Sequence, residues 1–399
     1  MANNNDKKVL NVPALRFPEF SGEWEKYVLT EFVERVTRRN KGNECKLPLT
    51  ISAQYGLVDQ ITFFNKIIAS DDMSNYYLLT NGDFAYNKSY SSEYPWGAIK
   101  RLDRYEYGAL SSLYICFRPL NHVSSDFLTH YFETKKWHQG ISEIAVEGAR
   151  NHGLLNIGIQ DFFATKHYLP QSILEQEKIA CFLNLIEERI RLQNKIIEDL
   201  KKLKSAIIEK EYTHKTKSNS HIGDFIEQTS KRNKNRAIQN VLSVSNRQGF
   251  IQQSEQFENR SVASDDTSSY KIVKKNNFAF NPARINVGSI ARLTTFDRGI
   301  VSPMYICFRT KDTLFPEYLD YYFETKQFFT EIQKRLEGSV RQCLSFEGLC
   351  NIPLCIPTIE VQQQVGKQLS TLVQEIKLEI DFLELLQRQK KFLLHQMFI

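Results

Sequence analysis

The chain has 399 residues, of which 42% are hydrophobic, 25% charged and 12% aromatic, and its formal net charge is +6. This length exceeds what one ordinary hydrophobic core supports, so two or more domains are expected. The sequence begins with polar residues and contains no run of about twenty apolar ones, so we expect neither a signal peptide nor a membrane span and favour a cytoplasmic protein. The mild basic excess is compatible with a nucleic-acid partner without requiring one.

Residues 1–20 are expected to form an N-terminal arm, because a polar leader is followed by a segment with two prolines, Pro13 and Pro18, which favour extended backbone. Residues 21–169 are expected to form the first globular unit. Its LLT, FAY and LYICFR runs are rich in aliphatic and aromatic residues and predict strands. The run SDFLTHYFETKKW has helical spacing and predicts a helix that begins at Ser125.

Residues 170–212 predict one long helix with a coiled-coil seam. Apolar side chains recur there at alternating spacings of three and four, which is typical of a helix that packs along a partner helix. The seam residues are Ile179, Leu183, Ile186, Ile190, Ile197, Leu200 and Ile207. Residues 213–220 are polar and are expected to be a linker.

Residues 221–356 repeat the first unit in register, and 357–399 repeat the long helix. FAYN from Phe84 matches FAFN from Phe278, and YFETK from Tyr131 matches the same letters from Tyr322. The second seam comprises Val365, Leu369, Leu372, Ile376, Leu383, Leu386 and Leu393. The fold class predicted is therefore mixed α/β, with two similar globular units separated by two long antiparallel coiled-coil helices and related by a pseudo two-fold axis.

Motifs for catalysis are weak. The sequence has no glycine-rich phosphate loop, and the Phe280–Ala283 run lacks the second proline and the aromatic residue of an adenine methyltransferase motif. Glu133 and Lys135, with Glu324 and Lys326 in the second unit, spell the ExK half of a metal-dependent nuclease site. They fall in helical patterns rather than on strands, so we expect a solvated helix face with local ion pairs and no catalytic residues.

Metal and disulfide sites are also not expected. The seven cysteines include no CxxC pair and none stands near a histidine at zinc spacing. Cys116 and Cys307 lie in the apolar YICFR runs and are expected to be buried core residues.

Four features together resemble the specificity subunit of type I restriction-modification systems: the opening PALRFPEFSGEW, the ARINVGSIAR run from Ala283, the EGSVRQCLSFEGLCNIPLCIP run from Glu337, and the proline-led helix after each unit. The resemblance covers nearly the whole chain. It implies two target recognition domains, each reading one half of a bipartite double-stranded DNA site. It further implies helices that hold two DNA methyltransferase subunits, with two endonuclease (restriction) subunits joining that core, in a bacterium or archaeon. AdoMet, ATP and Mg²⁺ would then belong to the partner subunits, and this chain would hold no cofactor.

The two units differ most in residues 41–61 against 234–253 and in 88–97 against 282–288. Divergent loops on a shared core predict two different half-sites and an asymmetric recognised sequence. Residues with hydrogen-bonding groups suited to base edges or phosphates are the candidate DNA contacts. They are Gln54, Tyr55, Lys88, Tyr90, Arg101 and Arg150 in the first unit, and Asn246, Arg247, Gln248, Arg284, Asn286, Arg292 and Arg341 in the second. Because Arg101 matches Arg292, and Arg150 matches Arg341, these four suit positioning of the DNA backbone better than sequence reading.

Two other functions stay open. A free-standing nuclease could use the ExK pairs, and it would cut DNA alone in the presence of magnesium. A structural protein could dimerise through its coiled coil, and it would not co-purify with a methyltransferase.

Overall fold

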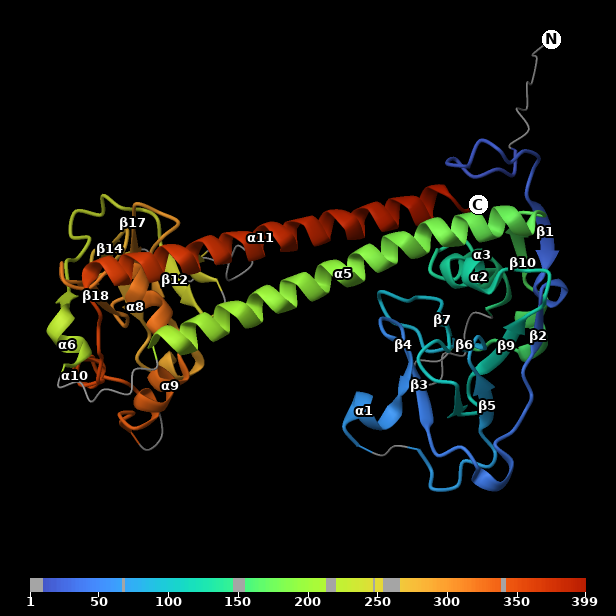
Figure 1. Ribbon diagram of the computed structural model, residues 1–399, viewed down its shortest axis with the longest axis horizontal. Helices are drawn as coiled ribbons and strands as arrows, with labels where there is room; N and C mark the ends of the chain where they lie inside the picture. The colour runs from blue at the N-terminus through green and yellow to red at the C-terminus, as the bar shows by residue number, and fades with distance from the viewer. Residues whose placement is uncertain are drawn as a thin grey trace, which may run out of the picture. The chain divides into compact units, whose positions relative to one another are not determined.

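The computed structural model describes residues 10–66, 69–145, 155–212, 220–246, 248–253, 266–338 and 342–399. Contacts divide the chain into unit 1, residues Met1–Gln193 with Phe382–Ile399, and unit 2, residues Asn194–Asp381. Figure 1 shows the elements of each unit. None of the helices in the described ranges is both long and apolar enough to cross a bilayer.

Unit 1 contains two four-stranded sheets and a group of helices. The sheet orders are β2-β9-β6-β7 and β4-β3-β8-β5, and a separate antiparallel pair joins β1 to β10. The elements are β1 (Glu25–Val28), η1 (Leu29–Glu31), β2 (Val33–Arg35), η2 (Lys41–Asn43), β3 (Pro48–Ser52), β4 (Gly56–Asp59), α1 (Gln60–Phe64), β5 (Tyr77–Thr80), β6 (Phe84–Asn87), β7 (Ala98–Arg101), β8 (Tyr107–Leu110), β9 (Ile115–Pro119), α2 (Ser125–Tyr131), α3 (His138–Ile144), α4 (Ile159–Phe163) and β10 (Lys166–Leu169), with parts of the two long helices.

Strand β6 shows why the unit has three layers. Side chains alternate across a strand, so Phe84 and Tyr86 point to one face and Ala85 to the other. Phe84 and Tyr86 pack into a core shared with α2, α3, α4 and the long helices, whereas Ala85 packs between the two sheets. In Figure 1, α2 and α3 lie between the strands of unit 1 and the first part of α5 (Ile173–Tyr212). The pattern of one small residue between two aromatic ones therefore fits a strand that packs against helices on one face and against a second sheet on the other.

Unit 2 repeats the first sheet of unit 1 in full, whereas the counterparts of the second sheet form two separate antiparallel pairs, β12-β13 and β14-β17. Its sheet order β11-β18-β15-β16 matches β2-β9-β6-β7, and Glu227 lies opposite Arg309 just as Glu34 lies opposite Arg118. Its elements are α6 (Ile222–Phe225), β11 (Ile226–Thr229), β12 (Leu242–Ser245), β13 (Gly249–Gln252), β14 (Lys271–Lys274), β15 (Phe278–Phe280), η3 (Ile285–Val287), β16 (Ile290–Arg292), β17 (Arg298–Val301), β18 (Ile306–Thr310), α8 (Pro316–Tyr322), α9 (Lys326–Gln333) and α10 (Phe346–Cys350). The predicted duplication is thus confirmed at the level of strand pairing.

Two long helices, α5 and α11 (Ile359–Gln396), complete the fold. Each contributes to both units. In unit 1, Arg189 of α5 lies over the ring of Phe382 and Glu187 pairs with Lys390, so residue numbers rise along α5 as they fall along α11 and the two segments are antiparallel. In unit 2, the end of α5 shares a core with the beginning of α11. The predicted fold class, mixed α/β with two long helices, is confirmed.

The structure places every predicted seam residue away from solvent. Ten of the fourteen are buried, and four are half-buried, namely Ile190, Leu200, Ile207 and Leu383. Among the polar residues that interrupt the seams, Gln193 is buried, and Lys204 and Lys390 each pair with a glutamate of a globular unit.

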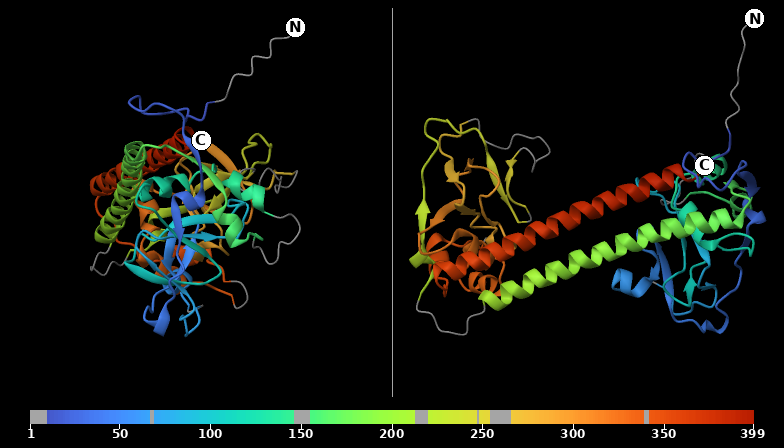
Figure 2. Two further views of the ribbon diagram at one scale, coloured as in Figure 1. Left: turned by 90° about the vertical axis from the view of Figure 1, so that its right-hand side faces the viewer. Right: turned by 45° about the horizontal axis from the view of Figure 1, so that its top comes forward.

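The N-terminal arm of unit 1 packs on the end of α11. The Leu15 amide donates to the Gln396 carbonyl at 2.9 Å, and the rings of Trp24 and Phe398 meet edge to face at 6.3 Å. Both views in Figure 2 show the C-terminus beside this arm. Residues 10–20 form neither strand nor helix and include a turn at Pro18 and Glu19. The predicted linker, 213–220, lies outside the described residues except for Ser220.

The glutamate and threonine of each ETK sequence lie in a turn between two helices, and this corrects the prediction of one continuous helix. Helix α2 ends at Tyr131 and α3 begins at His138, so Glu133 lies in the turn between them. The Thr134 hydroxyl donates to the Tyr131 carbonyl at 2.7 Å, and the Thr325 hydroxyl of unit 2 accepts from the Phe328 amide at the start of α9. A buried threonine at this point competes for backbone hydrogen bonds and divides one helical pattern into two helices.

Candidate nucleic-acid interface

A hairpin tip carries the first group of candidate contacts in each unit. Ser52 lies opposite Gly56 in the β3–β4 hairpin, and Ser245 lies opposite Gly249 in the β12–β13 hairpin, so the two tips occupy matching positions. Residues 53–55 read AQY and residues 246–248 read NRQ. Gln54, Tyr55 and Gln248 are exposed, whereas Arg247 lies outside the described residues. The two hairpins therefore share the same strand pairing but have different residues at their tips.

The second divergent loop of unit 1 lies next to its hairpin tip. Tyr94 and Gly97 line a cavity of about 370 Å³ together with Gln54. Gly97 has φ +80°, and a Cβ there would lie 2.1 Å from the Asn87 carbonyl oxygen, so only glycine fits this turn. Earlier in the same loop, Lys88 and Tyr90 are half-buried.

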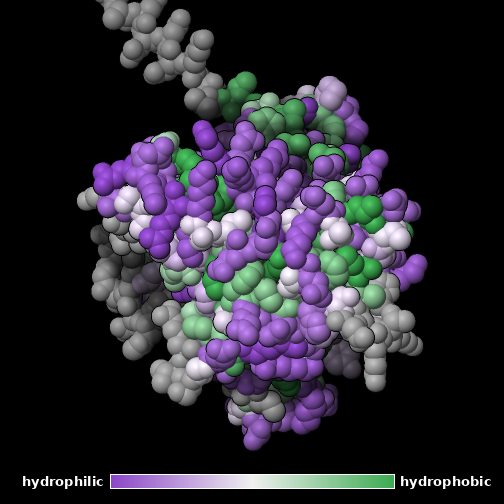
Figure 3. Space-filling model, turned by 90° about the vertical axis from the view of Figure 1, so that its left-hand side faces the viewer, coloured by the Kyte–Doolittle hydropathy of each residue, from purple (hydrophilic) through white to green (hydrophobic). Residues whose placement is uncertain are grey.

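The corresponding loop of unit 2 also lies next to its tip. A Cβ on Gly288, the counterpart of Gly97, would lie 3.6 Å from the Cβ of Asn246. Arg284 and Asn286 are exposed on the turn before Gly288. The face of unit 2 in Figure 3 is mainly hydrophilic, with smaller hydrophobic areas between. In both units, then, the two segments that diverge in sequence adjoin in space.

Arg101 and Arg292, which we expected to position the DNA backbone, form ion pairs with acidic residues of their own unit. Arg101 bonds to Asp103 and Asp126, both at 2.6 Å, and Arg292 pairs with Asp320 at 3.1 Å and with Glu317 at 3.4 Å. Their charge is balanced inside the unit, and these ion pairs hold α2 or α8 on the sheet; a contact of either arginine with DNA stays a prediction. The second matched pair, Arg150 and Arg341, lies outside the described residues.

Unit 1 also has basic and aromatic groups near its tip that the sequence did not indicate, of which Lys100 is half-buried and the others are exposed. Lys100 and Arg104 line a cavity of about 250 Å³ with Gln54 and Tyr55. The Tyr55 ring lies 6.3 Å from that of Phe63, which lies 4.9 Å from that of Phe64, and all three rings are more than two-fifths exposed. Exposed aromatic clusters are uncommon in a monomer surface and mark interaction sites. No periodic pattern distinguishes them in sequence.

The ExK glutamates are engaged in ion pairs. Lys390 Nζ lies 2.7 Å from an oxygen of Glu133 and 2.7 Å from one of Glu187, and Lys204 Nζ in unit 2 lies 2.6 Å from Glu324. Lys204 and Lys390 hold matching positions in α5 and α11, so each long helix provides one lysine for one such glutamate. We call these two contacts the lysine links.

One cluster in unit 1 has metal-ligand chemistry. Within the described residues, a single group of three potential metal ligands has its ligand atoms within 4.8 Å of one another. It consists of His130, Glu133 and Glu187. The Lys390 ammonium already supplies a cation to both carboxylates there, and Lys100 lies 3.5 Å from Glu133. The arrangement is therefore that of an ion-pair network rather than that of an open metal site.

The long helices present a second apolar surface. Leu185 and Leu385 in unit 1 are 64% and 59% exposed, and Leu203 and Leu378 in unit 2 are 50% and 68% exposed. These leucines lie outside the seam. The two helices therefore carry exposed apolar side chains in addition to their buried seam.

The buried cysteines agree with their predicted core role. Cys116 packs between the sheets of unit 1, and burial raises the pKa of its thiol well above the ordinary range. Burial likewise raises the pKa of Cys307 to about 12. All seven cysteines are free thiols.

By sequence, no protein-family model and no curated protein matches the chain. Solved structures do match. The type I restriction-modification S subunit from M. genitalium aligns at 14% identity over 97% of this chain and 99% of its own, with a TM-score of 0.55. A structure from work on complex assembly and conformational transition of the type I R-M system aligns at 15% identity over 93% and 96%, with a TM-score of 0.53. The HsdS subunit from Thermoanaerobacter tengcongensis aligns at 16% identity over 94% and 96%, with a TM-score of 0.47. The first two matches show that this chain shares the fold of those structures.

Proposed function

We propose that this chain is a non-catalytic DNA specificity subunit of a type I restriction-modification complex. One observation carries the proposal: the same hairpin, in the same register, presents AQY in one unit and NRQ in the other. A shared scaffold with different hydrogen-bonding groups at the tip is suited to reading two different DNA sequences. Each unit then binds one half of an asymmetric bipartite site.

The long helices supply the other parts of this function. A helix of 40 residues is about 60 Å long at 1.5 Å per residue, so α5 and α11 are suited to setting the spacer between two half-sites. Their exposed leucines provide apolar surface on which two methyltransferase subunits can dock. Endonuclease subunits join through the methyltransferases, and AdoMet, ATP and Mg²⁺ belong to those partners in the cytoplasm of the host cell.

Mapping methylated positions across the genome of cells that carry this chain and its methyltransferase tests the proposal. We expect a bipartite motif with unlike halves and a fixed gap. Cleavage of DNA by the pure chain with Mg²⁺ alone would instead favour the nuclease alternative. Failure of any methyltransferase to co-purify would favour a coiled-coil scaffold.

Substitution at either hairpin tip should relax one half-site only. We expect Gln54→Ala or Gln248→Ala to weaken cognate binding by about 1–3 kcal/mol, because each removes a side chain that can bond to a base edge. The methylated motif of each variant should become degenerate in one half and stay intact in the other. Gln139→Ala, on the exposed face of α3, is the control and should leave the motif unchanged. An equal loss on cognate and scrambled DNA would show that the tips contact only phosphate.

Lengthening both helices should lengthen the spacer. Since Arg189 lies 5.3 Å from the Phe382 ring, insertions after Asn194 in α5 and after Ile380 in α11 fall at about the same level. Seven residues in each helix keep the heptad in phase and add roughly 10 Å, which corresponds to at most about three base pairs. The motif of the variant should keep both half-sites and gain spacer length. An unchanged gap would contradict the proposed measuring role.

A further inference from the structure

One short segment has the same construction in both units, although neither copy belongs to the hairpin tips. In unit 2, the buried Asn233 side chain donates to the Ile238 carbonyl at 2.9 Å and accepts from the Ile238 amide at 3.2 Å. In unit 1, the buried Asn40 side chain makes the same two bonds to Cys45, at 3.0 and 2.9 Å. We call residues 37–45 and 230–238 the pinned loops.

The backbone of the two pinned loops also agrees. Asn43 and Arg236, each three residues after the pinning asparagine, have positive φ of 54° and 53°. The Asn40 amide bonds to the Tyr76 carbonyl, and the Asn233 amide bonds to the Tyr270 carbonyl. A buried asparagine with every group bonded and a left-handed residue at the same place make each loop rigid.

Basic residues occupy three matching positions on the pinned loops. Arg38, Arg39 and Lys41 in unit 1 correspond to Lys231, Arg232 and Lys234 in unit 2. The other positions between the asparagine and the end of each loop differ, for example Glu44 against Ala237. The two copies have therefore kept the pinning residue and the charge while they changed the rest.

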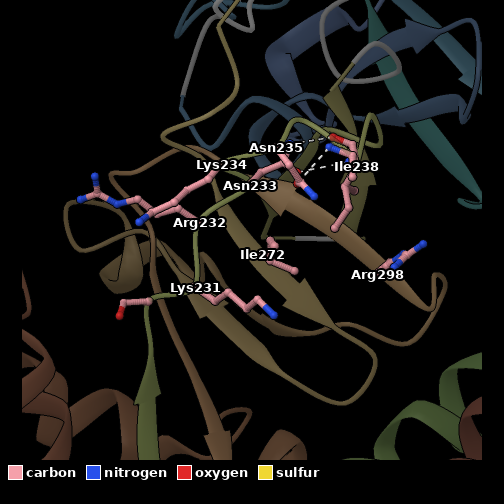
Figure 4. Close-up of a pocket in the computed structure, with 10 residues that line it drawn as sticks. Lys231, Arg232, Asn233, Lys234, Asn235, Ile238, Ile272 and Arg298 are labelled. Atoms are coloured by element: carbon pink, nitrogen blue, oxygen red, sulfur yellow. Dashed lines mark hydrogen bonds between the residues drawn. The ribbon is translucent and has the colours of Figure 1, made fainter.

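In unit 2 the pinned loop borders a hollow of about 820 Å³. Lys231, Arg232, Lys234 and Arg298 line it, all four are exposed, and no acidic residue lines it. Figure 4 shows Arg232 and Lys234 extending to one side of the segment while Asn233 points the other way, into the turn that ends at Ile238. The pinned loop thus sets the direction in which Arg232 and Lys234 extend.

These cations differ from most arginines of the fold in having no carboxylate partner among the described residues. Arg292 and Arg309 pair with acids of unit 2, and so does Arg236 of the pinned loop itself, with Asp266 at 3.1 Å. For the four side chains around the hollow, the described part of the chain provides no ion pair. Four exposed positive charges with no acidic residue beside them create a positive potential that attracts anions.

We propose that the pinned loop of unit 2, with Arg298, binds backbone phosphates of duplex DNA independently of base sequence. The inference rests on the proposed DNA-recognition function and adds to it a contact separate from the hairpin tips. The copy in unit 1 makes a weaker contact of the same kind. There Glu44 lowers the local charge, and Arg39 donates to the Asn75 carbonyl at 2.6 Å and lies 4.2 Å from the Tyr77 ring.

The test uses the full chain and a fluorescent 30-base-pair duplex of random sequence, titrated by anisotropy over a range of NaCl concentrations. Each phosphate contact contributes about 0.9 to the slope of log affinity against log salt. The variant Lys231→Gln/Arg232→Gln/Lys234→Gln should lower the steepness of this slope by about 2 to 3 and weaken binding at least tenfold at low salt. Asn233 is retained, and the thermal unfolding curve checks that the variant is folded.

The matched control is Lys326→Gln/Lys367→Gln/Lys377→Gln, which removes the same charge from three exposed lysines of unit 2. Its slope should stay within about one unit of the wild-type slope. Equal loss in both triple variants would reduce the effect to net charge and overturn the inference. So would an unchanged slope in the pinned-loop variant, or a wild-type chain whose binding does not depend on salt.

A calorimetric titration with inorganic pyrophosphate separates duplex backbone from a free phosphate compound. One result would overturn the assignment to DNA. In it, the pinned-loop substitutions abolish saturable binding of pyrophosphate but leave the salt dependence of DNA binding unchanged. The random duplex makes these outcomes independent of any recognised sequence. Failure to find a bipartite methylated motif would count against the proposed function, whereas failure of the salt test would count only against the pinned loop.

Discussion

Replacing Arg16 by methionine should lower the free energy of unfolding of unit 1 by about 3 kcal/mol. Arg16 Nε and Nη2 lie 2.7 and 2.8 Å from the two oxygens of Glu175, whose side chain is 3% exposed. The Trp24 indole N–H is the only other group bonded to that carboxylate in the described part of the chain, at 3.2 Å. Removing one partner of a buried ion pair leaves an uncompensated charge, and this loss typically costs about 3–5 kcal/mol.

The measurement is urea unfolding followed by tryptophan fluorescence. All three tryptophans, Trp24, Trp96 and Trp137, belong to unit 1, so this signal reports the unfolding of unit 1 even if the two units unfold separately. Arg191→Met is the control, because its ion pair with Glu188 is exposed and is worth less than about 1 kcal/mol. Adding Glu175→Leu to Arg16→Met removes the stranded charge and should restore most of the loss. A double variant no more stable than Arg16→Met would contradict the ion-pair account.

The repeat and the seams could be predicted because they depend on regular spacing. Leucine and isoleucine at alternating intervals of three and four specify which face of a helix is buried, whatever the partner. The FAYN and FAFN strands are equally regular, because a small residue between two aromatic ones indicates a strand with two buried faces. Both features survive in the structure with little change in their bounds.

Features that depend on distant partners could not be predicted. Arg16 and Glu175 are separated by 159 positions in the chain, and nothing near either residue indicates the other. Arg101 is a candidate DNA contact because its guanidinium can donate to phosphates and base edges, and the sequence gives no sign of the ion pairs that it forms with Asp103 and Asp126. The helical pattern through Thr134 was misleading for a similar reason. The helix is interrupted there because the Thr134 hydroxyl bonds to the Tyr131 carbonyl, and the sequence does not show which acceptor a hydroxyl will bond to.

The pinned loops could not be predicted from the sequence for a different reason. Residues that read bases are expected to differ between the two halves, because the two half-sites are expected to differ. A contact to phosphate should instead be the same in both halves, as Lys41 and Lys234 are. A difference between the halves therefore does not mark the basic residues next to Asn40 and Asn233, and only the hollow in unit 2 distinguishes them from ordinary surface charge.

Replacing Lys390 by methionine should destabilise unit 1 by about 2 kcal/mol at neutral pH. Its ammonium is 2.7 Å from both Glu133 and Glu187, and His130 Nδ1 lies 3.7 Å from Glu187 without a hydrogen-bond partner in the described residues. Methionine fills the same space but leaves two close carboxylates to repel each other. The expected value is smaller than for Arg16 because the side chains of Lys390, Glu133 and Glu187 are 22%, 25% and 39% exposed.

The effect should depend on pH in a defined way. Burial raises the pKa of Glu133, but the ammonium groups of Lys390 and Lys100 outweigh burial and hold this pKa below its ordinary value of 4.5. Burial lowers the pKa of Lys390, but Glu133 and Glu187 outweigh it and raise this pKa above 10.5. A carboxyl group with a lowered pKa stabilises the fold above its ordinary pKa and ceases to do so as the pH falls through the folded value. The difference between wild type and Lys390→Met should therefore be constant from about pH 6 to 9 and shrink below about pH 4.5.

Unit 2 provides the control, since it contains the other lysine link and no tryptophan. Lys204→Met breaks the contact with Glu324 and should leave the tryptophan-detected transition of unit 1 in place. The position that matches Glu187 in α11 is Val373, so unit 2 has no counterpart of Glu187. Adding Glu187→Val to Lys390→Met removes the repulsion and should recover about half of the lost stability. If the double variant is less stable than Lys390→Met, or if the loss persists at pH 3.5, then lost packing and not charge is the reason that each long helix keeps a lysine at this position.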